Sequence, residues 1–185
     1  MKTASVYSNA PELQVMQWFN TPEPITLSDL RGKVVVIEAF QMLCPGCVSH
    51  GLPQAMRISE TFSQDDVVVI GLHTVFEHHS AMQPHALEAF LHEYRIKFPV
   101  GVDQPSEMDG MALPNTMQTY QLRGTPSLLV IDRMGRQRLN LFGQENDMKL
   151  AASISKLIYE APVAEETSNV RSIAGQVCTP IGCTN

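Results

Sequence analysis

An apolar run of β-branched residues that leads directly into a Cys-Pro-Gly-Cys motif is the strongest constraint on how this chain can fold. The run occupies residues 34–40 and contains a single acid, Glu38, and the motif occupies residues 44–47. Such a run predicts a strand buried on both faces of a parallel sheet. Pro45 favours a helix that starts directly after the first cysteine, because the missing N–H of a proline needs no partner at the first helical position.

The positions of the two cysteines point to redox chemistry. Cys44 would occupy the helix N-cap, where free backbone N–H groups and the positive end of the helix dipole favour a thiolate over a thiol. Cys47 would lie one turn into the helix, within reach of Cys44. Such a pair opens and closes a disulfide, with the exposed Cys44 as the attacking sulfur and Cys47 as the resolving sulfur.

Metal binding and an inert cysteine pair are the competing interpretations of the motif. Met42, Cys44 and Cys47 also fit a copper-chaperone loop, and His50 would add an imidazole to a soft metal site. A structural zinc site is disfavoured, because the chain offers no second ligand pair near Cys47. Further imidazole and thioether groups come later in the chain and suit Cu(I), although histidines in loops and methionines in cores are ordinary. These residues are His73, His78, His79, His85, His92, Met82, Met108, Met111 and Met117.

The net charge and the lengths of the apolar segments limit the kinds of binding partner and the cellular location that we expect. A net charge of −6 over 185 residues offers no basic face for phosphates, which disfavours nucleic-acid binding. No apolar run approaches about 18 residues, and residues 1–25 lack the apolar segment of a signal peptide, so neither a membrane span nor a leader is expected. We therefore expect a cytoplasmic protein. Four cysteines in two close pairs suit reversible redox work better than a framework of structural bridges.

The hydrophobic pattern predicts one α/β domain over residues 1–160 and a tail over residues 161–185. A short hairpin is expected within residues 10–33, before the first buried strand. Helices should cover both faces of the sheet. The other predicted elements are a helix from 44 to 62 kinked at Pro53, a strand at 67–72, a helix at 84–94, a strand at 98–103, a helix at 117–122 capped by Asn115 or Thr116, strands at 127–132 and 137–142, and a helix at 144–159.

Over about residues 10–160, the order of these elements and motifs resembles the thioredoxin superfamily. Residues 25–33 and the Cys-Pro-Gly-Cys loop are similar to its TlpA-like and AhpC/TSA-like redoxin branch. The resemblance implies a thioredoxin-like α/β fold with an N-terminal hairpin and a central helical insertion. It also implies a thiol–disulfide oxidoreductase that exchanges its cysteine pair with protein substrates, needs no cofactor and works with a reducing or oxidising partner protein. The competing class is a thioredoxin-like copper-binding protein or metallochaperone.

The resemblance also assigns roles to single residues. Glu38 matches the buried acid beneath the thioredoxin active site, which exchanges a proton with the resolving thiol, here Cys47. An acid inside an apolar strand has the raised pKa that this role needs. Thr125 and Pro126 match the cis-proline loop, so their peptide bond should be cis and lie against the cysteine pair, where the Thr125 backbone hydrogen-bonds an extended substrate peptide. Gly143 matches the family glycine after the last strand.

Some positions depart from the family pattern. Leu43 replaces the usual tryptophan before the first cysteine, Pro53 comes one residue later than the family's helix proline, and the Pro-Gly order within the motif is reversed. Peroxiredoxins carry a proline and a threonine at fixed positions before their cysteine. Ile37 and Gln41 occupy those positions before Cys44, which disfavours peroxidase activity.

The second cysteine pair lies at the end of the polar tail. Cys178 and Cys183 flank a Thr-Pro-Ile-Gly sequence that allows a tight turn, so their sulfurs could meet in a disulfide. We predict an accessory redox pair that exchanges electrons with Cys44 and Cys47. A structural staple of the tail, or a metal or partner contact, are the alternatives.

Overall fold

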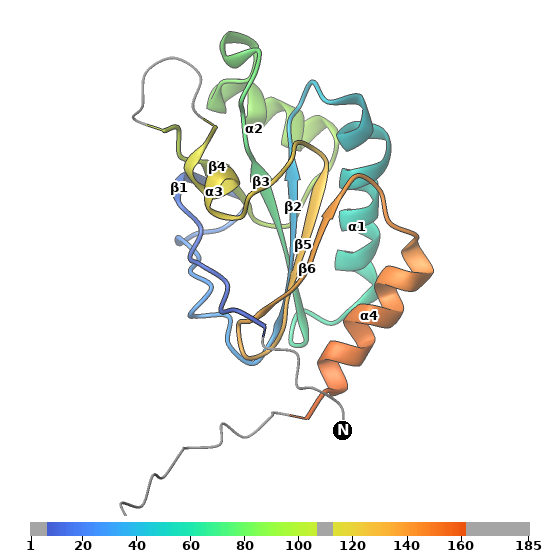
Figure 1. Ribbon diagram of the computed structural model, residues 1–185. Helices are drawn as coiled ribbons and strands as arrows, with labels where there is room; N and C mark the ends of the chain where they lie inside the picture. Colours follow the sequence, from blue (N-terminus) through green and yellow to red (C-terminus); the bar gives the residue numbers. More distant parts are fainter. Residues whose placement is uncertain (1–6, 107–112, 162–185) are drawn as a thin grey trace, which may run out of the picture.

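The computed structural model describes residues 7–106 and 113–161. In this part of the chain a six-stranded mixed sheet, ordered β1-β4-β3-β2-β5-β6, forms the centre of a thioredoxin-like α/β fold (Figure 1). The strands are β1 Val15–Phe19, β2 Val34–Phe40, β3 Val67–His73, β4 Val100–Asp103, β5 Ser127–Ile131 and β6 Gln137–Phe142. The helices are α1 Leu52–Thr61, α2 Pro84–Glu93, α3 Asn115–Thr119 and α4 Asp147–Tyr159, with a π-helical segment η1 at Cys47–Gly51 and a 3-10 turn η2 at His79–Ala81.

β2 is the strand that supports the cysteine motif, and all seven of its residues are buried. It pairs in parallel with β3 and antiparallel with β5, so both of its edges are hydrogen-bonded. The burial on both faces that the apolar run predicts is therefore confirmed. Alternation along the strand places Glu38 on the same face as Val36 and Phe40, which belong to the apolar cluster beneath α1.

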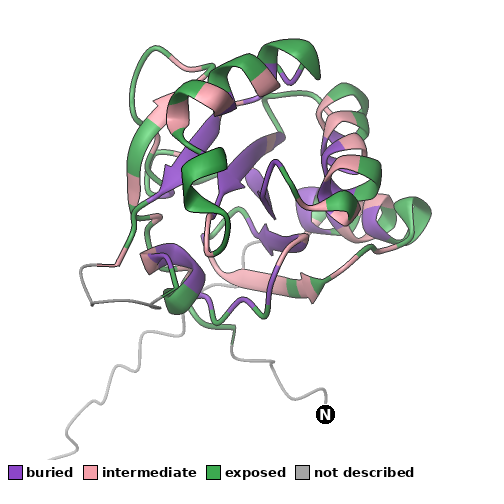
Figure 2. Ribbon diagram, turned by 90° about the horizontal axis from the view of Figure 1, so that it is seen from above, coloured by how far each residue is buried: buried purple, intermediate pink, exposed green. Residues whose placement is uncertain are grey.

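Helices lie on both faces of the sheet, as predicted, but they divide unequally between them. Figure 2 shows buried residues on the central strands and on the inner sides of the helices, with exposed residues outside. α1, α2 and α4 contribute to one apolar cluster, and α3 with the segment before β2 contributes to the other. The first cluster includes Leu52, Ala55 and Ile58 of α1, Leu87 and Leu91 of α2, and Leu150, Ile154, Leu157 and Ile158 of α4.

The helix that carries the cysteines starts at Pro45, directly after Cys44, as the proline predicts, but it is not regular. Cys44 precedes the first helical residue. In η1 the backbone amide of Leu52 donates to the carbonyl of Cys47, five residues earlier, in place of the usual four. A π turn of this kind accommodates one extra residue in a helix. This wide turn directly precedes Pro53, the residue at which the sequence predicts a kink.

The predicted N-terminal hairpin is wrong. Among residues 7–33 the structure forms one strand, β1, and its antiparallel partner is β4, far away in sequence. β1 thereby covers the edge of a short strand that would otherwise leave backbone groups unpaired. The two strands approach closely, because a Cβ atom added to Gly101 of β4 would lie 2.8 Å from Val15 and 3.3 Å from the Trp18 ring. Trp18 is therefore a packing residue.

α3 begins and ends earlier than predicted, and its cap comes from another element. The backbone amides of Thr116 and Met117 donate to the carboxylate of Asp103, at the end of β4, over 2.8 and 3.0 Å. Neither Asn115 nor Thr116 supplies a side-chain cap. α4 has a local cap, Asn146, whose side chain accepts from two amides of the first turn. None of the helices in the described ranges is long and apolar enough to cross a membrane.

Candidate active site

Cys44 and Cys47 form a disulfide at the head of the helix that follows β2, with their Cα atoms 5.2 Å apart. The two sulfurs differ in access, since Cys47 is fully buried and Cys44 is only partly buried. The backbone amide of Cys47 donates to Sγ of Cys44 over 3.2 Å. An N–H group aimed at that sulfur would stabilise a thiolate once the disulfide is reduced. The structure thus gives Cys44 both the access and the electrostatic environment of an attacking sulfur.

The loop before β5 lies directly against the disulfide. The Thr125–Pro126 peptide bond is cis. The carbonyl oxygen of Thr125 lies 3.5 Å from Sγ of Cys44, and a Cβ atom added to Gly46 would lie 3.2 Å from Cδ of Pro126. Thr125 and Pro126 are only partly buried, so their backbone borders the side on which Cys44 is accessible. The structure therefore brings together the cysteine pair and the two loop residues that the sequence resemblance singled out.

Glu38 is a buried acid on β2, behind the helix that carries the cysteines. Its side chain is 2% exposed, and Oε1 has no hydrogen-bond partner in the described residues. Burial without a compensating charge raises the pKa of this carboxyl well above its usual range. Oε1 lies directly against Gly51, where any Cβ atom would collide with it and would also come within 3.0 Å of Pro126. At position 51, any residue other than glycine would leave too little room for the Glu38 carboxyl group.

Gln41 is a residue of the site whose structural role the sequence did not reveal. Its side chain is 1% exposed. Nε2 donates to Oγ1 of Thr125 over 3.4 Å and to Oε1 of Glu77 over 3.5 Å, and Oε1 accepts from the backbone amide of Phe76 over 3.2 Å. One amide therefore links the end of β2 to the cis-proline loop and to the loop after β3. The only signal in the sequence is a polar amide in an otherwise apolar segment, because a buried amide needs partners.

His73, at the end of β3, lies in the core and not on the accessible side of the disulfide. It is fully buried, its ring centroid is 5.3 Å from that of Phe40, and neither ring nitrogen has a hydrogen-bond partner in the described residues. Burial lowers the pKa of His73 to about 4. The imidazole is therefore neutral at physiological pH, and its protonation opposes folding.

We expect His73 to weaken the fold in mild acid. Between pH 6.5 and about 4 the unfolded chain binds a proton at this histidine and the folded chain does not. The free energy of unfolding should therefore fall as the pH falls through this window, by about 3 kcal/mol in total for a shift of this size. In His73→Leu the free energy of unfolding should fall less over the same pH range, as measured by urea unfolding at successive pH values. His85→Leu, at an exposed position of α2, is the control, and equal slopes for the two variants would contradict the assignment.

Of the remaining histidines, His50 is exposed in η1, three residues after Cys47, and the other four lie on other elements. His78, His79, His85 and His92 are exposed on η2, its flanking loop and α2. Within the described ranges, no group of three or more His, Cys, Asp or Glu side chains could hold a metal ion. Of the candidate methionines, Met42, Met82 and Met117 are core residues. Four further candidates lie outside the described residues: Met108, Met111, Cys178 and Cys183.

Known proteins resemble this chain over nearly all of its described part. The sequence profile of the AhpC/TSA family matches residues 6–138. A crystallised thioredoxin-like superfamily protein is 61% identical, with a TM-score of 0.80 over 83% of this chain and 97% of that protein. A thiol-disulfide isomerase from Corynebacterium glutamicum is 52% identical, with a TM-score of 0.78 over 82% of this chain and 96% of the isomerase.

Among curated proteins, NHL repeat-containing protein 2 of Bos taurus is 28% identical over 137 residues. That match covers 73% of this chain and 18% of the bovine protein, so the chain spans about a fifth of this relative's length. The profile match covers well over half of the chain, and both similar structures share its fold and are matched over nearly their full length. The chain belongs to the AhpC/TSA family of the thioredoxin-like superfamily.

Proposed function

We propose that this chain is a thiol–disulfide oxidoreductase that exchanges its Cys44–Cys47 pair with protein disulfides and dithiols. The observation that carries the proposal is the disulfide itself, with its accessible sulfur at the head of a helix and its second sulfur buried behind it. The isomerase from Corynebacterium glutamicum, matched over nearly its full length, supports the same class of reaction. Nothing in the described residues or in these relatives favours the copper-binding alternative.

In the reducing direction the exchange has two steps. The Cys44 thiolate attacks one sulfur of a substrate disulfide, so that a mixed disulfide forms and the other substrate sulfur leaves as a thiolate. The Cys47 thiolate then attacks Sγ of Cys44 and releases the second substrate sulfur. Two electrons pass from the chain to the substrate, and the Cys44–Cys47 disulfide closes. A thiol reductant or a reducing partner protein must reopen this disulfide, and the oxidising direction is the reverse sequence.

Three other residues serve this reaction. Glu38 takes the proton of the Cys47 thiol in the second step, because an uncompensated buried carboxyl has a pKa high enough to exchange protons with a thiol. Thr125 and Pro126 form the surface along which an extended substrate peptide lies, with the Thr125 backbone as its hydrogen-bonding partner. Their position beside Sγ of Cys44 holds the substrate disulfide where the sulfur can attack it.

The reduction of insulin by dithiothreitol tests the proposal. The oxidised chain should accelerate the reaction in catalytic amounts, and Cys44→Ser should reduce the rate to that of dithiothreitol alone. Glu88→Gln, at an exposed position of α2, is the control, since it leaves both cysteine pairs intact. A wild-type chain that adds nothing to the uncatalysed rate would refute the proposal. Metal analysis of the anaerobically purified protein separates it from the copper alternative, which requires stoichiometric copper held by the Cys44–Cys47 pair.

We also propose that Cys178 and Cys183, which lie outside the described residues, act as an accessory redox pair. If Cys178 and Cys183 pass electrons to the Cys44–Cys47 pair, the Cys47→Ser variant should form a cross-link from Cys44 to a tail cysteine on stepwise reoxidation. Peptide mass mapping would detect it. Removal of residues 176–185 should then slow turnover with a protein disulfide. Unchanged turnover together with the absence of the cross-link would exclude the relay.

A further inference from the structure

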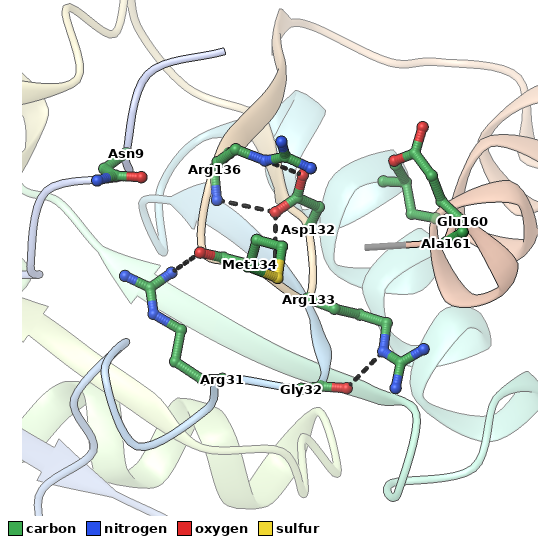
Figure 3. A pocket seen from close by; sticks show the side chains of 10 residues that line it. Asn9, Arg31, Gly32, Asp132, Arg133, Met134, Arg136, Glu160 and Ala161 are labelled. Carbon is green, nitrogen blue, oxygen red and sulfur yellow. Dashed lines mark hydrogen bonds and ion pairs between the residues drawn. The ribbon is translucent and has the colours of Figure 1, made fainter. Parts of the chain in front are cut away.

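A cavity lies at the end of the sheet opposite the disulfide. It has a volume of about 580 Å³ and is bordered by residues before β2, by the β5–β6 turn and by the end of α4 (Figure 3). Gly32 precedes β2, whereas Cys44 follows it, so the length of this central strand separates the cavity from the site. The volume falls within the range of small-molecule sites. Leu157 and Met134 provide apolar wall, and arginines dominate its charged side.

Two of these arginines are fixed in position without being neutralised. Nη1 of Arg31 donates to the carbonyl of Met134, and Arg133 donates to the carbonyls of Gly32 and Ile158 over 2.8 and 3.0 Å. Figure 3 shows the bonds to Met134 and Gly32 as dashed lines. Neither guanidinium has a carboxylate partner among the described residues. Backbone carbonyls orient these groups but leave both full positive charges available.

The acids of the cavity are already occupied by other arginines. Asp132 is 3% exposed and accepts from Nε of Arg136 over 2.8 Å and from Nη1 of Arg138 over 2.9 Å. Arg138 also forms an ion pair with Glu160. The carboxylates are therefore committed to Arg136 and Arg138, and the charges of Arg31 and Arg133 remain uncompensated. This local positive charge stands out on a chain whose net charge is −6.

We propose that this cavity binds a small organic anion, whose phosphate or carboxylate groups are held by Arg31 and by Arg133, on separate sides of the cavity. Guanidinium groups suit both kinds of oxyanion, because their N–H donors match the geometry of paired oxygens. The apolar wall and the volume accommodate an organic body larger than the anionic group alone. The proposal does not depend on the redox function, because none of the cavity residues belongs to the cysteine site.

Thermal unfolding of the full oxidised chain tests this site with inorganic phosphate and malonate as probes. Chloride at equal ionic strength is the reference. Either probe should raise the unfolding midpoint, by about 3 to 6 °C at about ten times its dissociation constant. The double variant Arg31→Gln/Arg133→Gln should weaken probe binding at least about tenfold, by the loss of two charge-assisted contacts. Arg95→Gln/Lys97→Gln, which removes two exposed charges outside the cavity, is the matched control and should bind as the wild type does.

The outcomes decide both the site and the ligand class. An Arg-dependent shift with phosphate alone identifies a phosphate group, a shift with malonate alone identifies a carboxylate, and a shift with both supports the shared oxyanion site. The proposal is overturned if the probes raise the unfolding midpoint equally in the double variant, or if they raise it no more than chloride does. Since Arg133 also supports two backbone carbonyls, Arg31→Gln alone serves as a second variant. It should weaken binding severalfold, and full retention of binding in this variant would also overturn the proposal.

Discussion

Replacement of Cys47 by serine is expected to convert the chain into a trap for its substrates. Cys44 can still attack a substrate disulfide, because its accessible position and the amide N–H aimed at its sulfur do not depend on the Cys47 thiol. No second thiolate is then available to resolve the mixed disulfide. Turnover should fall to the uncatalysed rate, and covalent complexes should accumulate.

Mass spectrometry of acid-quenched mixtures with a disulfide-bonded protein measures both effects. Each complex should contain one chain linked through Cys44. Cys44→Ser is the matched control, because it removes one sulfur from the same disulfide but leaves only the buried one. If Cys44→Ser traps as much substrate as Cys47→Ser, then the two cysteines do not have the assigned roles.

Replacement of Glu38 by glutamine is expected to remove the internal base without changing the shape of the side chain. In the wild type, the rate of disulfide exchange should rise as the pH passes through the raised pKa of Glu38, since the carboxylate then accepts the Cys47 proton. The variant should be slower at neutral pH by about tenfold or more, a modest share of what a positioned base contributes. The deficit should shrink in alkali, where hydroxide deprotonates the thiol directly.

The same substitution should stabilise the fold above the ordinary pKa of a glutamate. A raised pKa in the folded state means that the folded chain holds a proton that the unfolded chain has lost, so the free energy of unfolding falls as the pH rises through that window. Glu38→Gln should abolish this fall, whereas Glu88→Gln, at an exposed position of α2, should not. If Glu38→Gln left the dependence of stability on pH and the pH–rate profile unchanged, the pKa of Glu38 would not be raised and Glu38 would not be catalytic.

The central strand and the cysteine motif could be predicted from sequence because the signals for them are local. The apolar run at 34–40 and Pro45 fix the strand and the helix start within one short segment. The long amphipathic segments of α2 and α4 also appear close to their predicted bounds, because helical periodicity is a property of each segment alone.

The errors arise where distant residues determine the structure. The partner of β1 is β4 and not a neighbouring strand, and the cap of α3 is Asp103 and not a residue of its own first turn. In the π segment a backbone amide bonds to the carbonyl five residues earlier in place of four, a change that apolar periodicity does not register. Gln41 gains its role from three partners on two other loops, so its position next to the motif gave no indication of it.

A single-turnover exchange measurement tests the central claim most directly. The fully reduced chain, with Cys178 and Cys183 replaced by serine, is mixed with insulin in the absence of other thiols, quenched with acid and analysed by intact mass and peptide mapping. We predict that the chain loses two hydrogen atoms through closure of Cys44–Cys47 while one insulin disulfide gains two. A chain that remains reduced while insulin keeps all its disulfides would contradict the account.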